Sequence, residues 1–402
     1  MRPLEGLKVL DFAWSVAGPF VGRSLADFGA TVVRVESATR PDPARTFGPF
    51  ADGQFDLEHS MMFENYNIGK WGLALDLSRD EGRAVARDLA AWADVVVESF
   101  SPGQMARFGL DYETLRKRSP GVIMLSTSLL GQTGPHAQVT GFGSAGAALA
   151  GFQLLAGNPG EIPIGSGTAY TDSVAPRFSI FLLLAALDHR GRTGEGMLID
   201  VGQVESAIQF LAPQIAHHGE SGVNAQADGN RDPSFAPHGA FQTVKEGRWL
   251  AVAVRNDAEW QRLAVHMGRP ELGLDPRFGT LAARKANEDE LEAVVSAWTR
   301  DRDAADLESQ LQALDIPAHI VTEPGDYVCD PHLLARGHFV RKPHPRMGET
   351  IFEGALYRLS DTPARYDRIA PTVGRDSDHV LREYLAYSSE RIAALKASGA
   401  LT

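Results

Sequence analysis

Asp172 occupies a position where a carboxylate could act as a nucleophile. It follows a glycine-containing segment, residues 165–171, and directly precedes an apolar stretch, residues 173–188, whose length and composition predict a buried helix. A carboxyl group with an ordinary pKa of about 3.9 is ionised at neutral pH and needs no general base before it attacks a carbonyl carbon. The alternative is structural, because an aspartate at a helix start often caps it by accepting a backbone N–H. Spacing alone leaves both interpretations open and favours the cap.

Motifs for other chemistries are incomplete. Residues 17–22 do not match G-x-G-x-x-G, and Pro19 removes an N–H that a dinucleotide pyrophosphate would use. Ser144 lacks the first glycine of a G-x-S-x-G elbow because Phe142 stands there. The histidines show no H-E-x-x-H spacing, and Cys329 is the single cysteine. We therefore predict no metal site and no nicotinamide cofactor.

Composition narrows the possible partners. The chain has 402 residues, and 51 acidic side chains outnumber 39 lysines and arginines, for a net charge of −12. This balance argues against a nucleic-acid groove or a polybasic membrane surface, although a local basic pocket for one phosphorylated ligand remains compatible with it. We see no signal segment and no run of 18 apolar residues. The expectation is a cytoplasmic protein without nucleic-acid or membrane partners.

The elements that would position Asp172 alternate between strands and helices. Apolar runs predict strands at residues 8–12, 31–35, 94–98, 122–126 and 197–201, with helices at 20–28, 78–92, 112–117, 173–188 and 205–217 between or after them. Such alternation is typical of a parallel sheet covered on both faces, as in Rossmann-like α/β folds. The glycine- and alanine-rich stretch from 131 to 167 fits neither a plain helix nor a plain strand.

A linker rich in glycine, asparagine, aspartate and proline is predicted at residues 218–237. Beyond it, a hairpin, helices near 258–267, 288–299 and 304–313, and a strand at 318–321 predict a smaller α+β domain. A final helix is expected at 378–398. The predicted organisation is a large domain over residues 1–217, the linker, a small domain over 238–330, and a segment over 331–402 that serves as linker and returns to the large domain.

Several ordered stretches resemble the family III CoA-transferases, which include formyl-CoA transferase, carnitine CoA-transferase and α-methylacyl-CoA racemase. The resemblance covers practically the whole chain. It implies a Rossmann-like large domain with a parallel sheet, a smaller α+β domain, and an interlocked homodimer. The stretches that carry it are Leu4 to Asp11, Ala17 to Pro19, Leu25 to Ala30, Val32 to Glu36, Leu73 to Leu77, Val97 to Gly103, Gly131 to Pro135, Arg192 to Gly196, Asp275 to Phe278 and Asp330 to His332.

In this family a carboxylate just ahead of the long apolar helix is the nucleophile, and Asp172 holds that place. The resemblance therefore reverses the preference for a simple cap. It implies that coenzyme A, brought as an acyl-CoA substrate, is passed to a carboxylic acid through aspartyl anhydride and aspartyl-CoA thioester intermediates. Arg107 is the main candidate for a CoA phosphate, since a guanidinium binds phosphate oxygens in pairs, and Arg40 and Lys70 are weaker candidates. The remaining residues implied to line the CoA site are Val16, Ala17, Leu75, Leu77, Ser99, Phe100 and Thr140.

Departures from the family pattern bear on the reaction. Val16 replaces a glutamine of formyl-CoA transferase, and Ser99 replaces a common asparagine, so formyl-CoA and oxalate are disfavoured as substrates. The racemase branch has a Gly-His-Asp run where this chain has Gly141-Phe142-Gly143. Phenylalanine cannot move a proton, which favours transfer over racemisation. The alternatives are a 2-methylacyl-CoA racemase that uses another base such as His136, and a non-catalytic CoA-binding relative.

Overall fold

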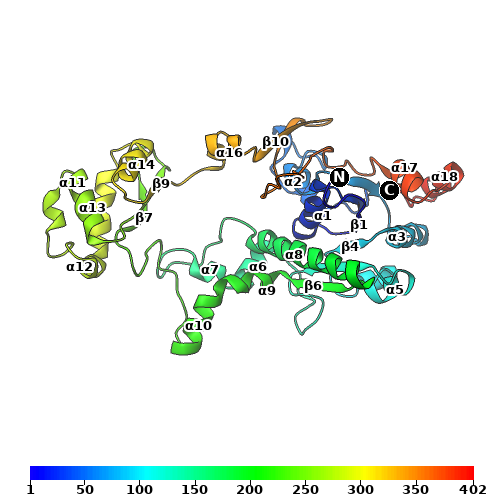
Figure 1. Ribbon diagram of the computed structural model, residues 1–402, viewed down its shortest axis with the longest axis horizontal. Coiled ribbons are helices and arrows are strands. Elements are labelled where there is room, and N and C mark those ends of the chain that lie inside the picture. The colour runs from blue at the N-terminus through cyan, green and yellow to red at the C-terminus, as the bar shows by residue number, and fades with distance from the viewer. The chain divides into compact units, whose positions relative to one another are not determined.

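Two compact units make up the computed structural model, which describes residues 1–402 (Figure 1). The first unit comprises Met1–Phe152, Gly165–Asn224 and His332–Thr402, and the second comprises Gln153–Ile164 and Ala225–Pro331. The large unit is therefore built from three separated stretches of chain. Residues 153–164, which we placed in the large domain, contact the second unit instead, and helix α10 (Ala212–Ser221) extends into the stretch predicted as a linker.

A six-stranded parallel sheet forms the centre of the first unit, with the strand order β3-β2-β1-β4-β5-β6. This is the order of a Rossmann-type doubly wound sheet, and the predicted fold class is confirmed. All five strands that we predicted in this unit are present, and β3 is an addition. The bounds are β1 (Lys8–Asp11), β2 (Thr31–Glu36), β3 (Trp71–Ala74), β4 (Val95–Glu98), β5 (Ile123–Ser128) and β6 (Leu198–Gly202).

Apolar side chains on both faces of this sheet are buried, because alternate residues along each strand point in opposite directions. Val9 belongs to a core shared with α1 (Ala17–Asp27) and α8 (Tyr170–Thr193). Leu10 belongs to a second core, which α3 (Asp80–Trp92), α4 (Gln104–Phe108) and α5 (Tyr112–Arg118) help to form. The helices thus hold the carboxyl ends of the strands, where ligands bind in such folds, in fixed places.

The carboxyl-terminal segment completes the second of these cores. Val380 and Ile392 pack with strand residues of the sheet, and the Asp376 and Ser377 side chains accept hydrogen bonds from the N–H groups of Gly72 and Ala74 on β3. The predicted single helix at 378–398 is divided instead, and Ala386 has a positive φ of 54° between its parts. The elements of this segment are α16 (Pro331–Ala335), β10 (Phe339–His344), β11 (Gly348–Glu353), α17 (Ser377–His379), η5 (Val380–Tyr384) and α18 (Ser389–Ala397).

Short helices occupy the stretches between the sheet strands. The predicted helix 205–217 is also interrupted, since α9 (Gln203–Ile208) ends before η3 (Gln209–Leu211) and α10 begin. The glycine-rich stretch contains two short helices, α6 (Gly143–Leu149) and α7 (Phe152–Leu155). The remaining short elements of the first unit are η1 (Pro43–Thr46), η2 (Ala51–Gly53) and α2 (Met61–Asn67).

The second unit has a core of its own around Trp260, beneath a three-stranded antiparallel sheet of order β7-β8-β9. The predicted hairpin and helices are present, and two of the helices have the predicted bounds. The elements are β7 (His238–Gln242), β8 (Trp249–Ala253), α11 (Asp257–His266), η4 (Pro270–Gly273), α12 (Leu281–Ala286), α13 (Glu288–Thr299), α14 (Ala304–Ala313), β9 (Ala318–Ile320) and α15 (Pro324–Tyr327).

Helix α8 is apolar around most of its circumference. By length and composition it could cross a membrane, and 44% of its most apolar 18-residue window is buried inside the protein. Core helices of globular proteins meet the same description. Its packing against α1 and α9 accounts for the buried side, and its exposed side carries Phe178, Phe181 and Leu184.

Candidate active site

A cavity of about 960 Å³ opens in the first unit beside the carboxyl ends of the parallel strands. Its wall is built by the segments that follow β1, β2, β3, β4, β5 and β6, together with Asp172 at the start of α8. Ten of the sequence-predicted site residues line it, and Lys70 does not. The ten are Val16, Ala17, Arg40, Leu75, Leu77, Ser99, Phe100, Arg107, Thr140 and Asp172. Residues from distant parts of the chain therefore meet at one place.

Asp172 lies inside the first turn of α8 and does not cap it. The helix begins at Tyr170, and its N-cap, Ala169, makes no side-chain capping bond. The Asp172 carboxylate instead reaches another element, where its Oδ2 accepts the Gly143 N–H at 3.0 Å. The predicted start of α8 at residue 173 is therefore late by three residues, and the capping interpretation is wrong. The carboxylate is directed toward the cavity wall.

Burial changes the acidity of this carboxyl group. The side chain is 7% exposed, and loss of solvent raises the pKa of Asp172 to about 6, while hydrogen bonds from Gly143 and the Gln203 side chain oppose the rise. The ordinary pKa that we assumed from the sequence is wrong for this site. The group is still mostly ionised at neutral pH, because a pKa of about 6 lies below it.

Gly143 allows this approach because it has no side chain. A Cβ atom built at Gly143 would lie 2.5 Å from Asp172 Oδ2, closer than real Cβ contacts come. Helix α6 begins at this residue, so its first free N–H points at the carboxylate. The glycine-rich stretch of the sequence therefore serves close contact between α6 and α8.

Two aromatic side chains join the segments after β1 and β4. The Trp14 and Phe100 rings meet edge to face with centroids 5.5 Å apart, and the backbone N–H of Trp14 donates to Ser99 Oγ at 2.8 Å. Arg40 lies over the Trp14 ring, 5.8 Å from its centroid. These contacts form an apolar wall with a polar edge, as sites for cofactor-sized ligands commonly have.

The two arginines of the cavity are available for an anionic ligand. Arg40 and Arg107 are exposed, and neither guanidinium forms an ion pair with a carboxylate of this chain. Lys70, one of the two weaker candidates, is misplaced in our prediction. It is fully buried outside the cavity lining, and its Nζ donates to Asp11 Oδ2 at 2.7 Å. A buried lysine already paired in this way cannot also hold a phosphate.

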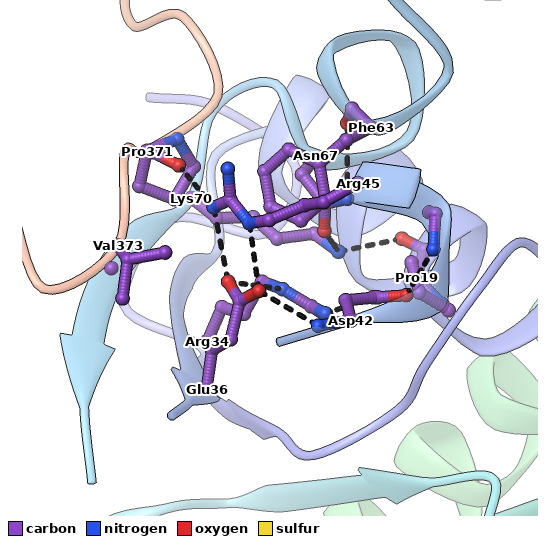
Figure 2. Close-up of polar contacts among 12 residues, drawn as sticks. Pro19, Arg34, Glu36, Asp42, Arg45, Phe63, Asn67, Lys70, Pro371 and Val373 are labelled. Atoms are coloured by element: carbon purple, nitrogen blue, oxygen red, sulfur yellow. Dashed lines mark hydrogen bonds and ion pairs between the residues drawn. The ribbon is translucent and has the colours of Figure 1, made fainter. Parts of the chain in front are cut away.

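Figure 2 shows a buried network of polar contacts that includes Lys70, Arg34 and Asp42. The Lys70 Nζ also donates to the Pro19 carbonyl at 2.8 Å, and Arg34 is paired with Asp42. Asp42 in turn accepts the Ser15 N–H at 2.8 Å. Desolvation lowers the pKa of Lys70 to about 8, and its pairing with Asp11 opposes that change.

This network fixes the backbone of the segment after β1. Ser15 has a positive φ of 64°, which is uncommon for a residue with a side chain. Its N–H bond to Asp42 and the Arg34 bond to the Ala13 carbonyl, 2.6 Å long, hold that conformation in place. Val16 and Ala17, which follow directly, reach the cavity wall as a result.

Sequence reasoning missed Gln203 and the contact of Gly143 with Asp172. Gln203 is the first residue after β6, it lines the cavity together with Asp172, and its side chain lowers the pKa of the Asp172 carboxyl group. One signal could have found it, because a polar residue that directly follows a strand of a parallel sheet lies at the ligand-binding edge. His136, the alternative base, is absent from the cavity lining. No group of three or more His, Cys, Asp or Glu side chains is placed to hold a metal ion.

Comparison with known proteins agrees with this geometry. Residues 4–377 match the family model of CoA-transferase family III. The chain belongs to this family. It is 33% identical to a succinyl-CoA–D-citramalate CoA-transferase of Chloroflexus aurantiacus, over 98% of this chain and 97% of that protein. It is also 33% identical to a succinate–glutarate CoA-transferase of Agrobacterium fabrum, over 95% of each chain.

Solved structures of the family share the fold. A CAIB/BAIF family protein from Brucella suis superimposes with a TM-score of 0.88 and 32% identity, over 95% of this chain and 99% of that one. The protein Rv3272 of M. tuberculosis gives a TM-score of 0.78 at 27% identity, over 94% and 98% of the two chains. The predicted family, fold class and enzyme class are thus confirmed, and CoA is a substrate of this family III CoA-transferase.

Proposed function

We propose that this CoA-transferase moves CoA from an acyl-CoA to a carboxylic acid through covalent intermediates on Asp172. The observation that carries the proposal is the position of the Asp172 carboxylate, which is ionised, held by two donors and directed at a cavity large enough for a CoA arm. An immobilised carboxylate next to a bound thioester reacts as an intramolecular nucleophile, which accelerates attack strongly.

The steps balance without an oxidant or a metal. An Asp172 oxygen attacks the thioester carbonyl, the carbon–sulfur bond breaks, and CoA thiolate leaves an acyl–aspartyl anhydride. The thiolate attacks the aspartyl carbonyl, which releases the donor carboxylate and forms an aspartyl-CoA thioester. The acceptor carboxylate then attacks this thioester to form a second anhydride. Attack of the thiolate on the acceptor's acyl carbon releases the new acyl-CoA and restores Asp172.

In the proposed complex the cavity wall binds CoA along its length. Arg107 and Arg40 take the phosphates, because they are the cations of the wall and lack carboxylate partners. The apolar and small residues that complete the wall contact the rest of the carrier and exclude water from the reactive intermediates. These are Val16, Ala17, Leu75, Leu77, Ser99, Phe100 and Thr140.

The named relatives suggest where a search for substrates should begin. Several of them carry succinyl-CoA in their names, with citramalate, malate or glutarate as the other partner. We propose succinyl-CoA as the first donor to test against a panel of dicarboxylic and monocarboxylic acids. Trp14, Val16 and Phe142 at the wall favour an acceptor larger or less polar than oxalate. Mass spectrometry of the acyl-CoA products identifies which acids of the panel accept CoA.

The covalent role of Asp172 is tested by trapping. Incubation with a reactive acyl-CoA and hydroxylamine should convert Asp172 to a hydroxamate that peptide mass spectrometry locates. Asp172→Asn should bind CoA and lose turnover by several orders of magnitude, because the amide is a poor nucleophile. A modified peptide that lacks residue 172, or near wild-type turnover in Asp172→Asn, would overturn the proposal.

Racemisation is the second candidate, and the cavity disfavours it. No histidine lines the cavity, and Phe142, which is 52% exposed, stands where the racemase branch has one. Solvent deuterium incorporated at the α-carbon of a 2-methylacyl-CoA would support racemisation, whereas transfer requires no such exchange. A non-catalytic relative would retain CoA affinity yet give no hydroxamate in the trapping experiment.

A further inference from the structure

The Gln203 side chain lies beside the nucleophile, and the reaction described above gives its amide a use. The Gly143 N–H donates to Asp172 from the start of α6, and Gln203, at the start of α9, lines the same cavity and lowers the pKa of the Asp172 carboxyl group. We propose that Gln203 and the Gly143 N–H form the oxyanion site for the aspartyl carbonyl during the steps in which CoA joins and leaves Asp172. This inference rests on the covalent role proposed for Asp172.

The orientation of the Gln203 amide follows from its contact with Thr171. Thr171 is fully buried, and its hydroxyl lies 3.2 Å from both Gln203 Oε1 and the Gly143 carbonyl oxygen. With Oε1 accepting from Thr171, the Nε2 atom faces the carboxylate. The opposite orientation would place the amide oxygen against a negatively charged carboxylate, which is unfavourable in a site with so little water.

The location of Gln203 makes it rigid. It is 8% exposed and lies in the first turn of α9, directly after β6. Thr171 and Asp172 are adjacent on α8, so one amide is fixed by two consecutive residues of that helix. A donor held in this way needs no reorganisation when charge develops on its acceptor, and such preorganisation is the main source of oxyanion stabilisation.

The donors act on specific steps. Once one Asp172 oxygen is acylated, the other is the aspartyl carbonyl oxygen. That oxygen becomes negative when the thiolate attacks the anhydride and again when the acceptor carboxylate attacks the aspartyl thioester. Oδ2 accepts the Gly143 N–H, so we assign Oδ2 as the oxyanion and Oδ1 as the attacking atom. The first and last attacks place their charge on the acyl carbonyl, so they do not use this site.

Gln203→Leu removes the donor and retains a side chain of similar size. We expect kcat to fall by roughly 10²–10³, the loss seen when one oxyanion donor is removed, with KM for the acyl-CoA changed by less than about threefold. The acid limb of the rate profile should move to higher pH, because a donor that favours the ionised carboxylate is gone. Quenched single turnovers should show slower formation of the aspartyl-CoA thioester.

A second variant and a control separate this role from a structural one. Gln203→Glu keeps the length of the side chain and adds a negative charge, which should move the acid limb further in the same direction. Gln261→Leu changes an exposed glutamine of α11 and should leave both kcat and the acid limb of the pH–rate profile unchanged. A merely structural role for Gln203 would lower thermal stability without moving the acid limb.

The two proposals fail in different ways. If the wild-type enzyme gives no hydroxamate at Asp172, the covalent mechanism fails whatever Gln203 does. If the wild type is labelled, and folded Gln203→Leu retains kcat within about twofold with an unchanged acid limb, only the oxyanion role of Gln203 is overturned.

Discussion

The Asp172 carboxylate combines two requirements that oppose each other. In the mechanism proposed above, its burial at the cavity wall protects the anhydride and thioester intermediates from water, yet burial also disfavours the ionised form that must attack. Two donors from α6 and α9 limit that cost, so the pKa settles at about 6. The nucleophile therefore works close to its titration range, where small changes in its neighbours alter the active fraction.

We expect the activity to decline as the pH falls through about 6. The pKa of Asp172 is raised to about 6, so the carboxyl group becomes protonated and non-nucleophilic below that pH. An unperturbed aspartate would give a decline near pH 4. The check is kcat/KM measured between pH 4.5 and 8, with circular dichroism confirming that the protein stays folded. A rate that is constant down to pH 4.5 would contradict the assignment.

Asp172→Asn should be more stable than the wild type at neutral pH. A carboxyl group with a raised folded-state pKa is ionised more easily in the unfolded chain. The buried Asp172 carboxylate therefore lowers the free energy of unfolding, by an amount that grows as the pH rises from about 4 to about 6 and stays constant at higher pH. The shift of about two units corresponds to roughly 3 kcal/mol at neutral pH, and asparagine removes that destabilisation. Urea unfolding at pH 7.5 and at pH 4 measures it, and an equal gain at both pH values would contradict this explanation.

Two short elements, α6 and the first turn of α8, determine the geometry at the nucleophile. Gly143→Ala would place a methyl group 2.5 Å from Asp172 Oδ2, so one of the two helices must shift. Because reacting atoms tolerate little displacement, we expect turnover to drop about 10²-fold or more. Gly165→Ala is the matched control, since nothing lies within 4 Å of its Cβ and its φ is ordinary. Equal turnover in both variants would argue against this contact.

The segment after β1 depends on the charges beneath it. Asp42→Asn removes the partner of Arg34 in a fully buried pair and weakens the acceptor for the Ser15 N–H. Breaking one side of a buried ion pair costs about 3–5 kcal/mol, which urea unfolding would show. Glu113→Gln breaks an exposed pair with Arg116 and should cost less than about 1 kcal/mol. A small effect in Asp42→Asn would mean that Asp11 alone satisfies Arg34.

Sequence patterns predicted the long elements well, because their apolar periodicity reflects burial directly. They missed β3, where Trp71-Gly72-Leu73-Ala74 is short and lacks a β-branched run, and where the carboxyl-terminal segment supplies hydrogen bonds to Gly72 and Ala74. Elements stabilised by distant partners carry little local signal.

The segments that line the site could be predicted from the sequence, but the contacts between their side chains could not. Family resemblance indicated the wall residues and Asp172, because they lie in recognisable stretches. Two contacts join residues far apart in the sequence, the pair of Lys70 with Asp11 and the contact of Gln203 with Asp172. Sequence spacing does not indicate whether these side chains are buried or exposed. The pKa of Asp172 depends on this burial, so it too required the structure.

At the level of the whole molecule, we predict a homodimer. Large apolar side chains are exposed on α8 and η3, and Phe178 and Phe210 contact each other with ring centroids 6.3 Å apart. Exposed apolar patches of this kind commonly mark interfaces between protein chains. Phe181→Asp, at a side chain 69% exposed, should shift the protein toward monomer in analytical ultracentrifugation. Leu274→Asp, at an exposed leucine of the second unit, should not. A monomeric wild type would contradict the prediction.

The return of residues 332–402 to the large sheet has a consequence for biosynthesis. The ribosome synthesises the chain from its amino terminus. Strands β1, β2 and β3 therefore emerge long before Val380 and Ile392, which help to cover one face of their sheet. The second unit has its whole core within residues 236–318 and is ready to fold earlier. Before residues 380–400 emerge, this apolar face of the large sheet is covered only by the helices α3, α4 and α5, and the part that stays exposed favours aggregation during synthesis.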